Sequence, residues 1–360
     1  MGAEVVLMKN LAEVDSNFKI ETKLEKEGIK FYDIKKSPFK IYGVFSGGEK
    51  FCRLPENVAR KVSEGVLYLH ANTAGGRVRF KTDSPYIAIL AKMNTDGIMP
   101  HFAFSGSAGF DMYEKTSNGE NYIKTFMPPI EMRQGYESIV ELGEKKLREI
   151  TINFPLYSEV SELYVGLDEN AAVMETSPYI NEKPLVYYGS SITQGGCASR
   201  PGNSYQAIIS RRFNLDYINL GFSGSAKGED EMTYYISSLE MSMFIYDYDY
   251  NAPSAEHLRT THEKLFKAVR AAHPDIPIII MSRPSYLFTP LVKERYEIIE
   301  RTYKNAVSSG DKNVYLLNGE TLMSLCKNDG TVDGCHPNDF GFASMAQAVG
   351  DVIEKILSCN

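Results

Sequence analysis

The hydrophobic pattern of this chain changes its period near residue 179, and this change constrains the fold more than any other feature. From about Phe39 to Leu167, apolar and polar residues alternate in short runs such as Gly76–Lys81 and Glu149–Phe154. A period of two is typical of strands that bury one face. Turn signals separate the runs at Gly47-Gly48, Gly75-Gly76, Asn118-Gly119 and Gly143-Glu144. We therefore predict an antiparallel β-sandwich, jelly-roll-like in type, for residues 1–178.

Residues 179–360 instead show apolar strands that alternate with longer helical stretches. The predicted strands are Leu185–Tyr188, Tyr217–Gly221, Met243–Asp247, Ile276–Met281 and Val314–Leu317. The predicted helices lie near Ser204–Arg212, Glu229–Leu239, Ser254–Ala272, Val292–Ser308 and Phe340–Leu357. Because nearly unbroken apolar strands are buried on both faces, we expect a flavodoxin-like three-layer α/β/α domain with a five-stranded parallel sheet. Ligands of such sheets bind at the carboxyl ends of the strands.

Charge and apolar run length exclude two classes of partner. The formal net charge is -7 and the pI is near 5.6, which argues against a nucleic-acid partner because phosphate binding needs clustered Lys and Arg. The longest apolar runs, such as Ile276–Met281, are far shorter than the roughly 20 residues that cross a bilayer. We expect neither nucleic acid nor membrane as a partner; the pattern does not define an oligomeric state.

The N-terminus and the cysteines predict a cytoplasmic protein. Residues 1–16 contain four charged side chains, so they lack the apolar segment of a secretory signal. The five cysteines are widely spaced and form no CxxC pair. They are Cys52, Cys197, Cys326, Cys335 and Cys359. This pattern fits reduced thiols in the cytoplasm.

Two segments at predicted strand ends carry groups that can do acyl-transfer chemistry. The first strand runs into Gly189–Thr193, a sharp exit that can expose Ser191. Alone, such a serine is more often a turn residue or an N-cap. Asp333 precedes His336 by three residues ahead of the last helix, and an esterase serine needs an imidazole held by such a carboxylate. The alternative is a loop Asp and a capping His.

Four motifs together give the chain a family resemblance. They are Gly189-Ser190-Ser191-Ile192, Asn219–Gly224, the Asn of Asp249-Tyr250-Asn251-Ala252, and Asp333–His336. In this order they resemble the conserved blocks of the SGNH/GDSL hydrolases. The resemblance implies that Ser191 is the nucleophile and that His336 and Asp333 complete a catalytic triad. It also implies an oxyanion hole formed by the N–H groups of Ser191 and Gly224 and the side-chain amide of Asn251.

Three positions depart from the family pattern. Ser190 stands where the family has Asp, Asp249 where it often has Gly, and Ala252 where it has Asp. None of these changes alters a proposed catalytic atom. They put the hydrogen bonding around Ser191 in doubt and indicate a subgroup rather than a typical lipase.

A second, weaker resemblance lies in the N-terminal half. Gly109–Tyr113 is similar to the Gly-x-Asp-Leu-Tyr motif of a β-sandwich module that precedes some SGNH hydrolases. The alternative is an ordinary strand with a hydrogen-bonded Asp. Members of this two-domain group, and related carbohydrate esterases, imply deacetylation of sugars.

The remaining polar residues do not clearly indicate a further binding site. Asp247–Asn251 starts like a calcium loop, but Ala252 and Leu258 replace the required Gly and Glu, so we expect no calcium site. Cys335 lacks a partner at metal-ligand spacing, and we expect a small buried thiol and neither metal nor cofactor. His257, His262 and His273 are expected to face solvent. Tyr248, Tyr250 and Arg283 are candidates for lining a sugar site, although a Tyr at a strand end is more often packing.

The residues and the two resemblances together predict a serine esterase that cleaves short acyl esters with no metal or cofactor. The resemblance to carbohydrate esterases implies that the acyl group is acetyl on a carbohydrate. The rate of the enzyme should rise through about pH 6 to 7, because an imidazole must be neutral to act as a base. Two alternatives are a lipase or thioesterase that uses the same triad, and a non-catalytic carbohydrate-binding protein.

Overall fold

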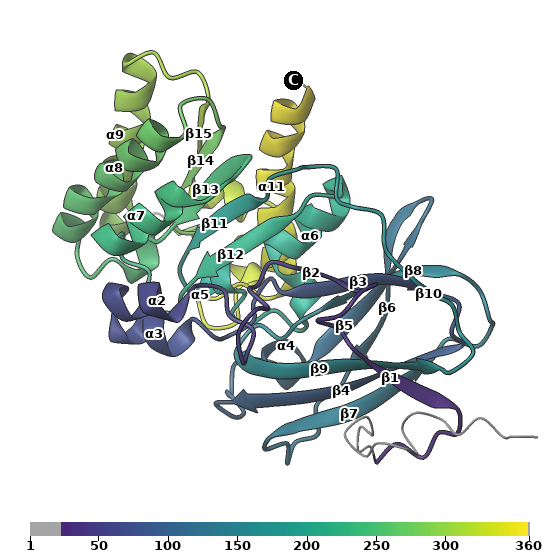
Figure 1. The fold of residues 1–360 in the computed structure, drawn as a ribbon. Helices are drawn as coiled ribbons and strands as arrows, with labels where there is room; N and C mark the ends of the chain where they lie inside the picture. The colour runs from purple at the N-terminus through teal and green to yellow at the C-terminus, as the bar shows by residue number, and fades with distance from the viewer. Residues whose placement is uncertain (1–22, 288, 359–360) are drawn as a thin grey trace, which may run out of the picture.

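The computed structural model describes residues 23–287 and 289–358 (Figure 1). The predictions made on residues 1–16 and on Cys359 lie outside this range. Within it, a β-rich half and an α/β half pack side by side, and the C-terminal helix lies in the α/β half. None of the described helices is both long enough and apolar enough to span a bilayer.

The N-terminal half is a sandwich of two antiparallel sheets, as predicted. One sheet has the order β1-β9-β4-β7 and the other β10-β3-β8-β5-β6, with β2 paired to β3. The strands are β1 (Ile29–Asp33), β2 (Lys40–Tyr42), β3 (Arg77–Thr82), β4 (Tyr86–Thr95), β5 (Phe110–Thr116), β6 (Gly119–Phe126), β7 (Gly135–Glu141), β8 (Arg148–Asn153), β9 (Ser158–Asp168) and β10 (Val173–Met174). Alternate residues such as Val78, Phe80 and Ile152 are fully buried between the sheets. The period of two seen in the sequence is this inward and outward alternation.

Short helices interrupt the sandwich, which the sequence pattern did not predict. They are α2 (Glu56–Val62), α3 (Glu64–Leu69) and α4 (Phe104–Ser107). Ala59 and Val66 are fully buried, and they pack in the apolar cluster that underlies the α/β sheet rather than in the sandwich. These helices are too short for a 3.6-residue hydrophobic period to be recognised in the sequence. Their apolar residues are accounted for only by the residues that they pack against in the folded protein.

The C-terminal half contains the predicted five-stranded parallel sheet. Its order is β12-β11-β13-β14-β15, with strands β11 (Leu185–Gly189), β12 (Tyr217–Gly221), β13 (Met243–Asp247), β14 (Ile278–Met281) and β15 (Val314–Leu317). Gly189 at the end of β11 is in register with Gly221 of β12 and Asp247 of β13. The first strand of the domain therefore lies between its second and third, which makes the end of β11 the topological switch point where ligands bind.

Helices cover both faces of this sheet, which confirms the three-layer prediction (Figure 1). They are α5 (Ser191–Gln194), α6 (Tyr205–Phe213), α7 (Asp230–Ser238), α8 (Ala255–Ala272), α9 (Pro290–Ser308), α10 (Gly319–Leu322) and α11 (Asp339–Ser358), with 3₁₀ turns η2 (Pro201–Asn203), η3 (Asp249–Asn251) and η4 (Lys327–Gly330). Residues of α6 and α11 pack with Tyr187 and Ile245 on one face. Residues of α7, α8 and α9 pack with Tyr188 and Phe244 on the other.

Asp111, the acidic residue of the Gly109–Tyr113 motif, joins the two halves. Its carboxylate is fully buried and accepts hydrogen bonds from Asn153 Nδ2 and from two groups of the α/β half, Arg200 Nη1 and the Gly202 N–H, each at 2.9 Å. A Cβ atom on Gly202 would lie 2.3 Å from the Tyr113 hydroxyl, so this close approach requires glycine. The motif is therefore more than an ordinary strand, because its Asp binds the neighbouring domain.

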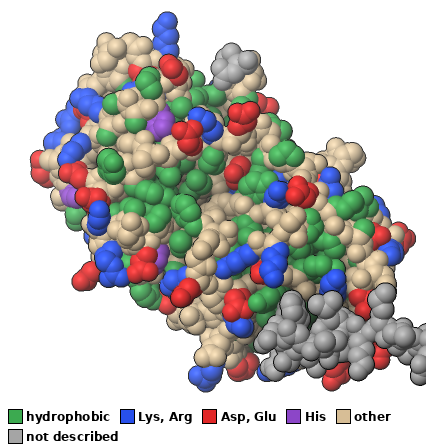
Figure 2. Space-filling model, viewed as in Figure 1, with side chains coloured by type: hydrophobic (Ala, Val, Ile, Leu, Met, Phe, Trp, Pro, Cys, Tyr) green, Lys and Arg blue, Asp and Glu red, His purple; other side chains and the backbone are tan. Residues whose placement is uncertain are grey.

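Charges of both signs are interspersed over the visible face of the molecule (Figure 2). No single-sign patch dominates this face, in keeping with the modest net charge of -7. Such a face does not provide the clustered cations that phosphate backbones require.

The prediction that three histidines face solvent was wrong for His262. His262 is only 2% exposed, its Nδ1 lies 2.8 Å from the Thr302 hydroxyl, and its ring packs against Tyr246. Burial lowers the pKa of His262 to about 3, so the ring is neutral. His257 and His273 are half-buried. His262 lies on the inner face of α8. His257, five residues earlier, lies on a different face, and His273 follows the last residue of the helix.

Candidate active site

Ser191 lies at the switch point of the sheet, as the first residue of α5 directly after β11. The Ser190 side chain caps this helix by accepting a hydrogen bond from the Ile192 N–H, and the Ser190 N–H donates to the carbonyl of Asp247 on the next strand. Ser191 itself is 8% exposed. The local backbone thus holds Ser191 at the carboxyl edge of the sheet. Helix α5 lies where the two halves of the molecule meet (Figure 1).

The structure brings Ser191 together with His336 and Asp333. Ser191 Oγ lies 3.0 Å from His336 Nε2, although the residues are 145 positions apart. His336 Nδ1 lies 2.7 Å from Asp333 Oδ2. The chain of contacts is that of a nucleophile, a base and a group that orients the base.

The loop that carries Asp333 and His336 is held by its own backbone. Asp333 Oδ1 accepts hydrogen bonds from the N–H groups of Cys335 at 3.0 Å and His336 at 2.8 Å. The Val332 N–H donates to the His336 carbonyl, and Thr331 pairs with Pro337. Burial alone would raise the pKa of Asp333, but the hydrogen bonds from His336 and Cys335 lower it to about 2. Asp333 is therefore ionised at neutral pH and fixes the orientation of the imidazole.

A tight turn after β12 presents Gly224 beside the nucleophile helix. Gly224 has φ +65, a conformation that favours glycine, and the turn is closed by the Ser225 N–H donating to the Phe222 carbonyl. Gln194 of α5 accepts a hydrogen bond from the Ser223 N–H at 3.0 Å. This bond fixes the turn relative to α5.

Asn251 lies close to the same turn. Its side-chain Nδ2 donates to the Phe222 carbonyl at 2.9 Å, which uses one of its two N–H bonds. The N–H groups of Ser191 and Gly224 donate to no other described residue. The N–H groups of Ser191 and Gly224 and one N–H of the Asn251 amide are thus free to donate to a ligand. They follow the carboxyl ends of β11, β12 and β13.

Two departures from the family pattern have a local explanation. Ser190 performs the helix-capping role that an Asp can also perform at this position. Asp249 is 2% exposed and is held by two arginines: Arg283 Nε at 2.9 Å and Arg295 Nε at 2.6 Å. These ion pairs hold its pKa below the usual value despite burial. Asp249 therefore braces η3, which carries Asn251.

The structure corrects one of the three candidate sugar contacts. Tyr248 is 1% exposed, packs beside Tyr188, and shares a 2.9 Å hydrogen bond with Thr261 of α8. It packs on the α7–α8 face of the sheet, whereas Tyr250 packs against the opposite face, because the chain leaves β13 and turns into η3 between the two residues. Tyr248 is a core residue and does not line the site.

Tyr250 and Arg283 remain candidates. The Arg283 guanidinium lies 4.2 Å from the centre of the half-buried Tyr250 ring and is paired with Asp249. Tyr250 also interacts with Cys335, which places it beside the triad loop. Cys335 is half-buried rather than buried as predicted.

The sandwich half contributes residues to the site that the sequence did not reveal. The His101 ring lies 5.7 Å from the His336 ring, centre to centre. The Tyr157 hydroxyl donates to the Ser191 carbonyl at 3.2 Å, and Gln194 donates to Asn72 Oδ1 at 3.1 Å. These residues lie in loops of the predicted sandwich, and no spacing rule connects them to a serine so far along the chain.

An open hollow of about 500 Å³ adjoins the triad on the His336 side. It is lined by His101, Ala103, Cys197, Ser199, Asp329, Asn338, Asp339 and Phe340. Most of these side chains are polar, while the Phe340 ring is 51% exposed. Asp339 is fixed by the Ser199 N–H at 2.8 Å.

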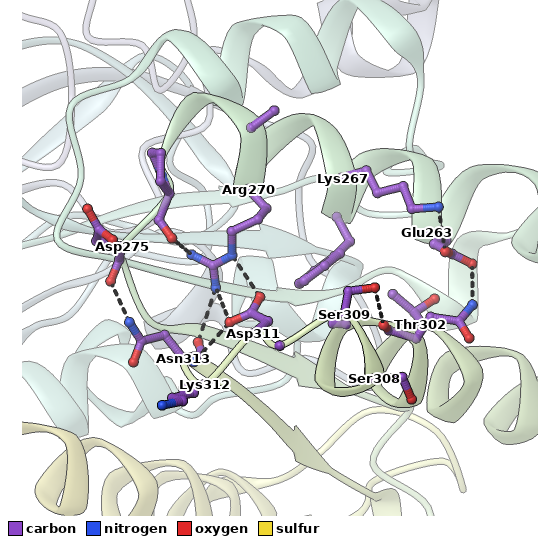
Figure 3. Close-up of a pocket in the computed structure, with 16 residues that line it drawn as sticks. Glu263, Lys267, Arg270, Asp275, Thr302, Ser308, Ser309, Asp311, Lys312 and Asn313 are labelled. Atoms are coloured by element: carbon purple, nitrogen blue, oxygen red, sulfur yellow. Dashed lines mark hydrogen bonds and ion pairs between the residues drawn. The ribbon is translucent and has the colours of Figure 1, made fainter.

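A second hollow, about 870 Å³, lies elsewhere, between the C-terminal parts of α8 and α9 (Figure 3). Arg270, which lines this hollow, is hydrogen-bonded within the protein. Its Nε donates to Asp311 at 2.8 Å and its Nη1 donates to the Ile276 carbonyl at 2.6 Å. It shares no lining residue with the triad hollow. It lies before β14 and β15, at the amino edge of the sheet, where ligands of such folds do not bind.

Asp247, at the end of β13, is an unusual buried acid. It is 1% exposed, and neither carboxylate oxygen has a hydrogen-bond partner among the described residues. Burial and the nearby Asp249 raise the pKa of Asp247 to about 8. The Asp247 carboxyl is therefore protonated at neutral pH.

Comparison with known families agrees with this site. Residues 182–354 match the GDSL-like lipase/acylhydrolase family, and residues 29–173 match the N-terminal domain of SGNH-hydrolase-type esterases known as GxDLY. No curated protein gives a significant match. The boundary at residues 178 and 179 falls in the gap between the two matches and stays a prediction.

Solved structures share the whole two-domain arrangement. A protein from Bacteroides ovatus described as a GDSL-like lipase is 28% identical, with a TM-score of 0.82 over 92% of this chain and 98% of that one. A salicylyl-acyltransferase from a tetracycline biosynthetic pathway is 18% identical, with a TM-score of 0.74 over 92% and 98%. An acetyl xylan esterase from Butyrivibrio proteoclasticus is 13% identical, with a TM-score of 0.60 over 92% and 99%. The last two show similarity of fold alone.

Together the two family matches cover both halves of the chain. The residues that converge on Ser191 lie in the segment matched by the hydrolase family, apart from those that the sandwich contributes. The chain therefore belongs to the SGNH/GDSL hydrolase superfamily, as a carboxylic ester hydrolase with an N-terminal GxDLY domain.

Proposed function

We propose that this enzyme is a serine esterase that removes short acyl groups, above all acetyl, from carbohydrates. The observation that carries the proposal is the continuous hydrogen-bonded chain from Ser191 through His336 to Asp333. Such a chain needs no cofactor, because the imidazole supplies and removes the protons.

In the proposed mechanism His336 Nε2 accepts the Ser191 proton while Oγ attacks the ester carbonyl. The resulting oxyanion receives hydrogen bonds from the N–H groups of Ser191 and Gly224 and from Asn251 Nδ2. His336 then gives its proton to the leaving alcohol as the carbon–oxygen bond breaks, which leaves an acyl-serine. Water, deprotonated by His336, attacks this ester in turn, and the carboxylic acid and free Ser191 are released.

The substrate class rests on two further observations. The hollow beside His336 is lined by several polar side chains and by one exposed aromatic residue, Phe340. The structural neighbour from Butyrivibrio proteoclasticus is described as an acetyl xylan esterase and has the same two-domain arrangement. Both support a hydroxylated leaving group and a small acyl group. Tyr250 and Arg283 are proposed to contact the substrate as well.

The test compares the wild type with Ser191→Ala on acetylated xylo-oligosaccharides, on monosaccharide acetates and on 4-nitrophenyl esters of two to sixteen carbons. We expect acetate release by the wild type and a loss of at least about 1000-fold in the variant. Ser210→Ala, a serine buried in α6 and remote from the triad, is the matched control. Equal turnover by wild type and Ser191→Ala would refute the nucleophile.

The same experiment separates the alternatives. A strong preference for palmitoyl over acetyl esters would indicate a lipase or thioesterase on the same triad. Binding of sugars with no acyl release would indicate a carbohydrate-binding protein. The cytoplasmic location predicted from the cysteines is also part of the proposal, and the free thiols of Cys52, Cys197, Cys326 and Cys335 support it.

A further inference from the structure

Three potential metal ligands meet at the catalytic imidazole. One ligand atom each from His101, Cys197 and His336 lies within 4.8 Å of the others. The residues come from the sandwich, from the loop after α5 and from the triad loop, so their meeting is a product of the tertiary fold. Nothing in the proposed hydrolysis uses the Cys197 thiol or a second imidazole.

The imidazole of His336 is already oriented as a metal ligand. Asp333 holds Nδ1 at 2.7 Å, which leaves Nε2 as the atom that faces away from the loop. A carboxylate that fixes one ring nitrogen while the other binds metal is the usual arrangement around zinc. The same contact that prepares His336 as a base therefore prepares it as a ligand.

The spacing of the three atoms is close to what a tetrahedral ion needs. Ligand bonds of about 2.0 Å to nitrogen and about 2.3 Å to sulfur place neighbouring ligand atoms about 3.5 Å apart. His101 is exposed, so rotation of its side chain can bring it closer to Cys197 and His336. Two nitrogens and one sulfur are a donor set that zinc prefers over calcium or magnesium.

Access and charge also favour a cation. His101 and Cys197 line the open hollow beside the triad, which provides a path from solvent. The Asp333 carboxylate lies 2.7 Å from His336 Nδ1, so an acidic group stands directly behind one of the three ligands. Ser191 Oγ, 3.0 Å from His336 Nε2, is placed to act as a fourth ligand.

We propose that His101, Cys197 and His336 form a reversible binding site for Zn²⁺ that blocks the catalytic base. Binding forms one bond each to His336 Nε2, a His101 nitrogen and Cys197 Sγ, and the thiol proton leaves to solvent. Nε2 then cannot accept the Ser191 proton, so the enzyme is inactive while the metal is bound. The inhibition rests on the proposed function, whereas the binding does not.

Binding is tested first in Ser191→Ala, which keeps the three ligands. Titration of this metal-free full chain with Zn²⁺ by calorimetry should give one ion per chain, and Co²⁺ should give a thiolate charge-transfer band in the near ultraviolet. Adding His101→Ala or Cys197→Ala should weaken Zn²⁺ binding at least about ten-fold, which is about 1.4 kcal/mol, and Cys197→Ala should abolish the band. His273→Ala and Cys52→Ser, which change the same residue types elsewhere, should leave the affinity unchanged.

Inhibition is tested in the enzyme with Ser191 intact. Zn²⁺ should abolish hydrolysis of 4-nitrophenyl acetate, a chelator should restore it, and His101→Ala should raise the inhibitory concentration at least about ten-fold relative to its own uninhibited rate. The proposal is overturned if Ser191→Ala binds no Zn²⁺, or if neither ligand replacement weakens binding. Zn²⁺ binding by an inactive wild type would support the metal site and refute only the proposed function.

Discussion

The Tyr157 hydroxyl, which belongs to the sandwich half, donates a 3.2 Å hydrogen bond to the backbone carbonyl of Ser191, the proposed nucleophile. Tyr157 is 9% exposed and its ring packs edge-on against Phe102. The N–H groups of Gly195 and Gly196 donate to the same carbonyl. The sandwich therefore helps to fix the position of the nucleophile.

Tyr157→Phe should lower kcat on 4-nitrophenyl acetate a few-fold and leave KM nearly unchanged. The carbonyl keeps its two backbone donors, so only one hydrogen bond is lost, and the unfolding free energy should fall by about 1 kcal/mol. Steady-state kinetics and thermal unfolding measure both effects. Tyr164→Phe, whose hydroxyl contacts Glu162 in the same domain, should leave kcat unchanged. Identical kcat in both variants would argue against a role of Tyr157 in positioning Ser191.

Asn251→Ala should reduce kcat by about 100-fold to 1000-fold, because it removes one donor to the oxyanion. KM should change little, since this donor acts mainly on the charge of the transition state. Asn318→Ala, which removes the N-cap of α10, is a control for general loss of stability. A kcat within three-fold of wild type, measured on a correctly folded variant, would remove Asn251 from the oxyanion hole.

Asp247→Asn should stabilise the protein increasingly as pH rises from about 4 to 8. The folded state holds the Asp247 proton up to a pKa of about 8, against an ordinary value of 3.8, so the wild type loses unfolding free energy over this window. The loss approaches about 1.4 kcal/mol per pH unit, and the amide does not share it. Denaturant unfolding at pH 5 and pH 8 measures the difference. A difference between variant and wild type that stays constant with pH would contradict the buried, protonated state.

Asp111→Ala should lower the unfolding free energy by about 3 kcal/mol or more, because it leaves the cation of Arg200 without its buried partner. The loss should reduce activity at elevated temperature more than the initial rate at 25 °C, since Asp111 lies outside the triad. Asp230→Ala, at an exposed ion pair with Lys264, should cost far less. Equal stability of the two variants would show that the motif does not hold the domains together.

Much of this fold, and the meeting of Ser191 with His336 and Asp333, were predictable because the signals are local. Apolar runs such as Met243–Asp247 identify buried parallel strands, and Ser191 and Asp333 lie in short motifs at strand or loop ends. His101, Tyr157 and the inner position of His262 were not predictable, because each depends on which distant segment packs against it. Tyr248 and Tyr250 illustrate the same difficulty. They are two residues apart, yet Tyr248 is buried in the core whereas Tyr250 is only partly buried.

The packing of the two short helices α2 and α3 affects how the chain can be divided. Ala59 and Val66 complete the apolar layer beneath β11 and β13, although they are encoded more than 100 residues before those strands. A fragment cut at the boundary between residues 178 and 179 would expose this layer to water and aggregate. The unit that can be transplanted, fused or evolved as an esterase is thus the whole pair of domains.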